Sequence, residues 1–138
     1  RMSRILAVDY GDMRTGLAVS DPLGLLASAA GVVTGADPAQ VADRVVAEAV
    51  QRGAAVILLG LPKNMNNTLG PRAEKTLAFA ELLRARFDGE VVLRDERNTT
   101  VSATRMLNET DTRGKKRKAV IDALSAAVLL QDYLDSLR

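Results

Sequence analysis

The chain has 138 residues, 47% of them hydrophobic, which is enough for one globular domain over residues 1–138. It contains no Cys and no His, which excludes cysteine nucleophiles, Ser-His-Asp triads, zinc fingers and histidine-ligated metals. The formal net charge is only +2, so the positions of the basic residues matter more than their number. The most apolar run, residues 54–59, is strand-sized. We expect a cytoplasmic protein with no signal peptide and no membrane partner.

The first third of the sequence predicts an antiparallel meander followed by a helix. Apolar residues at 4–9 and 16–20 predict two strands joined by a turn, and a third strand is expected near 30–34. An N-cap Asp and a following Pro predict the start of a helix that runs to residue 52. Its apolar residues recur at helical spacing, and Gly53 ends it.

The rest of the sequence alternates between strands and helices. A continuous apolar run between helices is typical of a buried parallel strand. In chain order we expect a strand at 54–59, a helix from 69 or 71 to 86, a strand at 90–93, a short helix from 99 or 100 to 107, a loop at 108–117 and a last helix at 118–137.

This order of elements predicts an α/β fold with a mixed five-stranded sheet flanked by helices. Right-handed crossovers put the fourth strand beside the first and the fifth beside the fourth, which gives the strand order 3-2-1-4-5. The carboxyl ends of the three parallel strands then meet at one edge, where open α/β sheets bind ligands. Asp9, the loop after Gly60, and Asp95 with Glu96 fall at that edge.

Three carboxylates are candidates for a site at this edge. Asp9 ends an apolar strand, where a carboxylate needs solvent, a partner or a cation, although it is also an ordinary turn residue. Asp122 shares a helix face with small and apolar residues and is expected to point at the sheet; the alternative is a favourable charge in the first helical turn. Asp95 and Glu96 point to opposite faces of a strand, and the apolar run before them does not choose between them.

Converging carboxylates without histidine indicate a hard divalent cation. Ligation by oxygen alone suits Mg²⁺ or Mn²⁺. Two such ions can activate water and stabilise the leaving oxygen when a phosphodiester is cleaved. The sequence therefore favours a metal-dependent phosphodiesterase.

A basic segment, RGKKRK at 113–118, directly precedes the Asp122 helix. It is expected to hold nucleic-acid phosphates near the metal edge, although a solvated loop is the commoner role of such a run. With only two Tyr and two Phe, an aromatic base-stacking platform is not expected, and recognition of backbone and shape fits better. The candidate nucleic-acid-binding residues are Arg14, Lys63, Arg97, Arg113, Lys115, Lys116, Arg117 and Lys118.

Four motifs together resemble the bacterial YqgF family of the ribonuclease H-like superfamily. They are DYGDMRTGLAVSD at 9–21, GLPKNM at 60–65, DER at 95–97 and IDALSAAVLLQDYL at 121–134. The resemblance covers nearly the whole chain and implies a ribonuclease H-like fold. It also implies that Asp9, Glu96 and Asp122 are the catalytic, metal-binding carboxylates, which selects Glu96 over Asp95. Family members are associated with maturation of the small-subunit ribosomal RNA precursor and have been proposed as Holliday junction resolvases.

The chain departs from the family pattern in two places. The GLP loop usually continues with Met-Asp-Gly-Thr, whereas here Asn66 and Asn67 replace Asp and Gly. An apolar residue usually follows DER, and here it is Asn98. Neither change touches the three carboxylates, but the first puts any role of a loop carboxylate in doubt.

Four functions compete at this point. The first is a metal-dependent nuclease on structured RNA, most of all the 16S ribosomal RNA precursor, and the second is a Holliday junction resolvase on branched DNA. The second requires a homodimer, because a four-way junction has two-fold symmetry, while the first is compatible with a monomer. An actin-like ATPase or sugar kinase shares the Gly-rich hairpin but needs two domains around its nucleotide. A non-catalytic RNA-binding module would tolerate changes of all three carboxylates.

Overall fold

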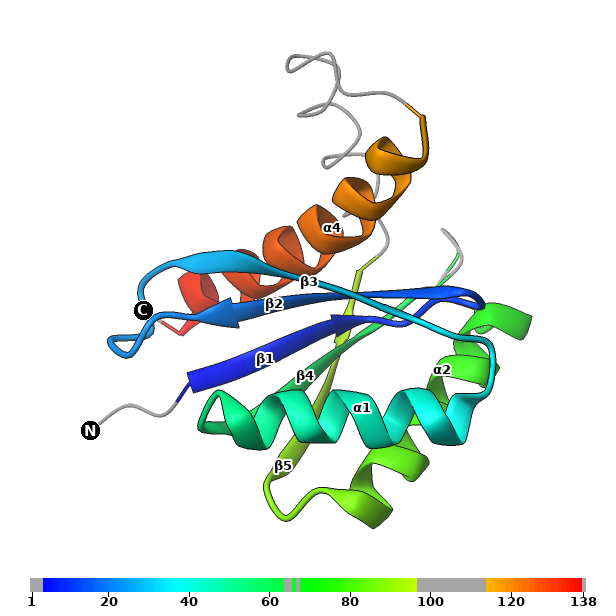
Figure 1. Cartoon of the computed structure of the whole chain (residues 1–138), viewed down its shortest axis with the longest axis horizontal. Helices are drawn as coiled ribbons and strands as arrows, with labels where there is room; N and C mark the ends of the chain where they lie inside the picture. Colours follow the sequence, from blue (N-terminus) through cyan, green and yellow to red (C-terminus); the bar gives the residue numbers. More distant parts are fainter. Residues whose placement is uncertain (1–3, 64–65, 67, 97–113, 138) are drawn as a thin grey trace.

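The computed structural model describes residues 4–63, 66, 68–96 and 114–137, with the backbone alone for residues 114–120 (Figure 1). The elements in chain order are β1 Arg4–Asp9, β2 Arg14–Ser20, β3 Ala27–Thr34, α1 Pro38–Gln51, β4 Ala54–Leu61, α2 Pro71–Arg86, β5 Glu90–Asp95 and α4 Gly114–Ser136. The short helix expected to end at residue 107 lies outside the described residues. Within the described ranges, no helix combines the length and the hydropathy that a membrane span requires.

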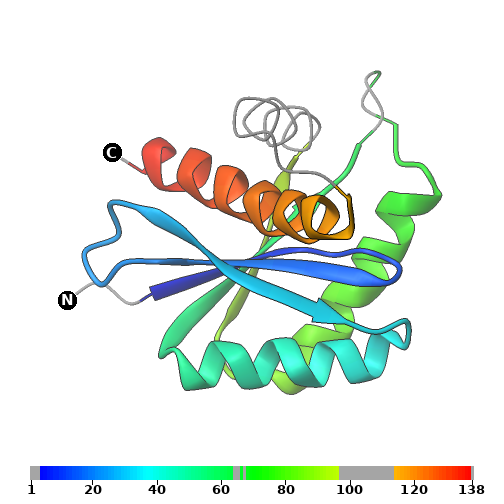
Figure 2. The same cartoon turned by 45° about the horizontal axis from the view of Figure 1, so that its top comes forward.

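The five strands form one mixed sheet in the order β3-β2-β1-β4-β5, which confirms the predicted topology. β2 is antiparallel to β1 and β3, whereas β4 is parallel to β1 and β5. Figures 1 and 2 show α1 and α2 on one face of the sheet and α4 on the other. The carboxyl ends of β1, β4 and β5 therefore lie at one edge of the sheet.

Alternate residues of the central strands pack into two separate cores. Leu6 and Val8 of β1 belong to the core beneath α1 and α2. Ile5 and Ala7 point the opposite way, into the core beneath α4. The helices contribute these buried side chains: Val41, Val45, Phe79 and Leu83 to the first core, and Ala126, Leu129, Leu130 and Leu134 to the second. Because β1 is buried on both faces, its sequence is a continuous apolar run.

The start of α4 differs from the prediction. A loop was expected to residue 117, but α4 begins at Gly114, so the segment after Arg113 is helical. Lys, Arg and Ala are good helix formers, and this preference outweighs the unfavourable position of positive charges at a helix N-terminus. Strands β2 to β5 are also longer than predicted, because pairing continues into polar residues: Arg14 pairs with Thr34.

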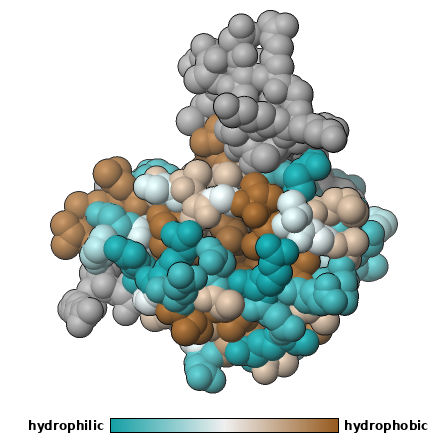
Figure 3. Space-filling model, viewed as in Figure 1, coloured by the Kyte–Doolittle hydropathy of each residue, from teal (hydrophilic) through white to brown (hydrophobic). Residues whose placement is uncertain are grey.

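The turn between β2 and β3 is ordered by hydrogen bonds to Asp21 rather than by burial. Asp21 Oδ1 accepts hydrogen bonds from the N–H groups of Leu26 (3.0 Å) and Leu25 (2.7 Å), which hold the pKa of this carboxyl below its usual value. Leu23 and Leu26 nevertheless remain 68% and 64% exposed. Figure 3 shows apolar surface at the left, where this turn lies in Figure 1.

Gly16 is the point where the backbone of α4 meets the sheet. A Cβ atom at this position would overlap the carbonyl group of Asp122 in α4. Gly60 in β4 differs from Gly16, because a Cβ atom there would overlap the carboxylate of Glu96, which is the far end of a flexible side chain. At Gly16, unlike Gly60, the chain needs glycine for the packing of two backbones.

Gly16→Ala should therefore destabilise the protein far more than Gly60→Ala. The first change forces α4 away from β2 and is expected to cost about 3 kcal/mol, the upper range for overpacking. The second change should cost about 1 kcal/mol or less, since the Glu96 side chain can turn away. Urea unfolding at equal protein concentration measures both losses. Equal losses in the two variants would contradict a backbone contact at Gly16.

Candidate active site

At the carboxyl edge of the sheet, the alternation of side chains along each strand decides which face each side chain points to. Ala7, Leu58 and Val92 all pack in the core beneath α4. Residues two positions further along each strand point the same way, so Asp9 and Gly60 lie on the α4 face. Glu96 stands four residues after Val92 and shares this face, whereas Asp95 is exposed and points away. On the face that packs against α4, the ends of β1 and β5 thus each carry an acidic side chain, and Gly60 of β4 between them has no side chain.

Glu96 crosses the gap at Gly60 and reaches Asp9. Its backbone N–H donates to the Leu61 carbonyl (3.2 Å), which extends the pairing of β5 with β4 by one residue. Its carboxylate lies over Gly60 and shares a hydrogen bond with the Asp9 side chain. Two carboxyl groups can share a hydrogen bond only if one of them carries a proton. The pair therefore brings carboxylate oxygens together on the α4 face, and it can share a proton below about pH 6.

The environment of Asp9 disfavours its negative charge. Burial raises the pKa of this carboxyl, and the charge of Asp122 raises it further. The hydrogen bond with Glu96 and the positive charge of Arg72 act in the opposite direction, and the resulting pKa is about 6. A shift of this kind, with a named charge partner at a sheet edge, is typical of functional carboxylates.

Asp122 lies beside this pair of acids, but its carboxylate forms an ion pair with Arg14. Arg14 Nε donates to Asp122 Oδ2 at 2.9 Å, between a side chain 40% exposed and one 25% exposed. Asp122 is close enough to Asp9 to raise its pKa. In the part of the chain that the structure describes, no three acidic side chains form a group that could hold a metal ion. The three-carboxylate metal site remains a prediction, with two members in contact and the third paired to Arg14.

Arg72 is a site residue that the sequence analysis missed. It stands in the first turn of α2 and donates to the Tyr10 carbonyl and to Asp12 Oδ1 (3.1 Å). Lys75, one turn further, also reaches Asp12 (3.5 Å). These contacts fasten the loop after Asp9 to α2. A basic residue in the first turn of a helix interacts unfavourably with the helix macrodipole. This unfavourable position is the feature of the sequence that could have indicated a tertiary contact for Arg72.

The expected nucleic-acid-binding residues fall into three groups. Arg14 is in the site, paired with Asp122, and Lys63 lies half-buried two residues after β4, at the same edge. Arg97 and Arg113 lie outside the described residues. The remaining candidates are in the first turns of α4, where only the backbone is described: Lys115, Lys116, Arg117 and Lys118.

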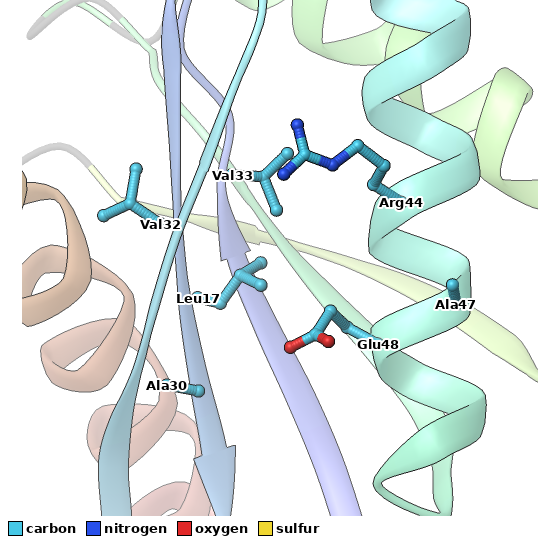
Figure 4. A pocket seen from close by; sticks show the side chains of 7 residues that line it. All are labelled: Leu17, Ala30, Val32, Val33, Arg44, Ala47 and Glu48. Carbon is cyan, nitrogen blue, oxygen red and sulfur yellow. The ribbon is translucent and has the colours of Figure 1, made fainter.

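A pocket of about 360 Å³ lies on the other side of the sheet, between β3 and α1 (Figure 4). Its walls are Leu17, Ala30, Val32, Val33, Arg44, Ala47 and Glu48. Arg44 Nη1 donates to the Thr34 carbonyl (2.7 Å), and Arg52 Nη2 donates to the Ala30 carbonyl (3.5 Å). These arginines therefore cover carbonyl groups of edge strand β3, which protects the edge. None of Asp9, Glu96 and Asp122 lines this pocket.

The strand order and the acids at the ends of β1 and β5 define a ribonuclease H-like domain of the resolvase and nuclease type. The chain belongs to the RuvX family: the model described as "RuvX: Holliday junction resolvase" matches residues 3–136. This result confirms the resemblance seen in the sequence motifs. A match over nearly the whole chain favours a nuclease over the kinase or ATPase alternative.

Two curated relatives match almost end to end. A protein of Acetivibrio thermocellus is 44% identical over 135 residues, covering 96% of this chain and 96% of that protein. One of Listeria monocytogenes is 45% identical over 141 residues, covering 96% and 98%. Both carry the name "Putative pre-16S rRNA nuclease".

Solved structures agree on the fold. Thermus thermophilus RuvC in complex with a Holliday junction substrate aligns with a TM-score of 0.59 at 15% identity, covering 99% of this chain and 96% of that one. The Fowlpox virus resolvase with junction DNA aligns with a TM-score of 0.57 at 14% identity, covering 97% and 98%. At this level of identity the likeness concerns the architecture.

The raised pKa of Asp9 predicts a pH-dependent stability. With a pKa of about 6 in the folded protein against an ordinary value of 3.8, ionised Asp9 destabilises the fold, so stability falls as pH rises from about 4 to about 6. Asp9→Asn removes this fall and should be more stable above pH 6, by at most about 3 kcal/mol. Urea unfolding between pH 4 and pH 7.5, without divalent cations, measures the difference.

Asp95→Asn, at the exposed end of β5, is the matched control and should follow the wild type over the same range. If Asp9→Asn is also indistinguishable from the wild type at every pH, Asp9 is an ordinary turn residue.

Proposed function

We propose that this chain is a divalent-metal-dependent nuclease that hydrolyses phosphodiester bonds in structured RNA, in maturation of the 16S ribosomal RNA precursor. The observation that carries the proposal is the contact between Asp9 and Glu96 on the α4 face, with Asp122 beside it, in a member of the RuvX family. The names of the relatives give the reaction and its RNA substrate. The cytoplasm is the compartment that this substrate implies.

The donor set fits Mg²⁺ or Mn²⁺. Asp9, Glu96 and Asp122 offer carboxylate oxygens without any nitrogen or sulfur, as hard cations prefer. Below about pH 6 the proton on the Asp9–Glu96 pair occupies oxygens that a cation would take, so cation binding should release it. A bound divalent ion would supply charge neutralisation at the phosphodiester and activation of the attacking water. Arg72 and Lys75 contribute by holding the loop after Asp9 in place.

A Holliday junction resolvase is the second candidate, favoured by the description of the matching family model. The same chemistry would serve both substrates, so the difference lies in the assembly. A resolvase needs two active sites related by two-fold symmetry, hence a homodimer. An RNA-processing nuclease can act as a monomer.

The three carboxylates provide the first test. Asp9→Asn, Glu96→Gln and Asp122→Asn should each remove nearly all cleavage with Mn²⁺ or Mg²⁺, and their effects should not add, because they share one site. Asp95→Asn is the control for Glu96→Gln, since it neutralises the adjacent acid on the opposite face. Circular dichroism verifies that each variant is folded.

The substrates for this assay are a 16S precursor fragment, a single-stranded RNA and a DNA four-way junction. Preference for the precursor supports the first function, and cleavage of the junction by a dimer supports the second. Full activity of the folded Asp122→Asn or Glu96→Gln protein would exclude the shared metal site. Binding without cleavage under every condition would leave an RNA-binding module.

The basic start of α4 should contribute to nucleic-acid affinity. Replacing Lys115, Lys116 and Arg117 with Ala should weaken binding to all nucleic acids alike. If each residue contacts one duplex phosphate, the slope of log K against log salt should shrink by about three units. As a control, replacing Arg84 and Arg86 with Ala should leave the slope unchanged. These residues lie in the last turn of α2, at the opposite end of that helix from Arg72. An unchanged slope in the α4 variant would mean that this segment is only a solvated surface.

A further inference from the structure

The pairing of Arg14 with Asp122 joins residues 108 positions apart and is imposed by the packing of α4 on β2. Arg14 and Gly16 are two residues apart on β2, so they lie on the same face of the sheet. Gly16 lets the backbone of α4 come down at Asp122, and Arg14 then stands beside that residue's side chain. The contact is thus built by the fold and is not a chance meeting of long side chains.

The geometry of this pair leaves much of the guanidinium available. The hydrogen bond uses Nε of Arg14 and one oxygen of Asp122. Within the described residues, Nη1 and Nη2 of Arg14 have no hydrogen-bond partner, and the side chain is 40% exposed. An arginine has five N–H donors in a planar fork, and its outer edge matches the oxygens of a phosphate.

The pair also stands beside the acids of the proposed site. Asp122 acts on the charge of Asp9, which in turn contacts Glu96. A divalent cation held by these carboxylates would have the positive charge of Arg14 as a close neighbour. Like charges repel, so the Arg14–Asp122 pair and a cation on Asp122 oppose each other.

We propose that Arg14 is a positioning residue that changes partner, holding Asp122 in the metal-free protein and turning to a substrate phosphate once a divalent cation binds the carboxylates. This inference rests on the metal site of the proposed function. It predicts two opposite effects of removing Arg14: the cation binds more tightly, and the nucleic acid binds less tightly. A purely structural ion pair would not separate these effects in this way.

Calorimetric titration of Mn²⁺, without nucleic acid, tests the first effect. Arg14→Gln should bind Mn²⁺ about two- to fivefold more tightly than the wild type, the range for an exposed charge pair. Arg94→Gln is the matched control: Arg94 Nη2 pairs with Asp132 Oδ2 of α4 at 2.9 Å. Asp132 lies ten residues beyond Asp122, about 15 Å along the helix. The control removes the same charge and should leave Mn²⁺ affinity unchanged.

The salt dependence of binding to a phosphorothioate stem-loop RNA, which resists hydrolysis, tests the second effect. With Mn²⁺ present, Arg14→Gln should reduce the slope by about one unit, the loss of one phosphate contact. Without a divalent cation the slope should be unchanged, because the charge of Asp122 then offsets that of Arg14. Arg14→Lys retains the charge and should restore the difference between the two conditions.

A measurement on the wild type covers the case in which Arg14→Gln does not fold. The Nε–H signal of Arg14 in nitrogen-15 NMR, assigned by its loss in Arg14→Lys, should be protected from exchange with water. Adding Mg²⁺ should remove that protection.

Three results would overturn the inference: wild-type Mn²⁺ affinity in folded Arg14→Gln, an equal loss of slope with and without Mn²⁺, or a protected signal that Mg²⁺ leaves unchanged. A wild-type protein that binds neither Mn²⁺ nor Mg²⁺ would overturn the metal site of the proposed function as well.

Discussion

The close approach of α4 to β2 at Gly16 is the constraint on which the rest of the site depends. It exists because one strand position lacks a Cβ atom, so the Asp122 carbonyl can lie against the sheet. That contact fixes the height and rotation of α4, and with them the distance from Asp122 to both Arg14 and Asp9.

The alternation of side chains along the strands places the other two acids, Asp9 and Glu96. On β1 the same alternation that sends Leu6 and Val8 toward α1 and α2 sends Asp9 toward α4. The parallel register of β4 and β5 brings Glu96 beside the gap at Gly60. The fold therefore gathers acids on one face without any local signal that they belong together.

This division explains which features the sequence could predict. The strand order, the N-cap at Asp37 and the position of Asp9 follow from local patterns and connection rules, and the structure confirms them. The choice of Glu96 over Asp95 needed the family resemblance. Residues 91–93 before them are all apolar, so the sequence does not show which of the two acids faces α4. The start of α4 was misplaced because a run of positive charges resembles a solvated loop. The contacts of Arg14 and Arg72 depend on tertiary packing between segments far apart in the chain.

The charges of the site explain how three acids can stand together in a folded, metal-free protein. Three ionised carboxylates so close would repel one another and cost stability. The chain offsets this cost with one guanidinium, that of Arg14 on Asp122, and below about pH 6 with a proton on the Asp9–Glu96 pair. Below about pH 6 the proton and the guanidinium together carry two positive charges, the charge of one divalent cation. Above that pH the carboxylate of Asp9 is the charge that a cation at the proposed site would neutralise.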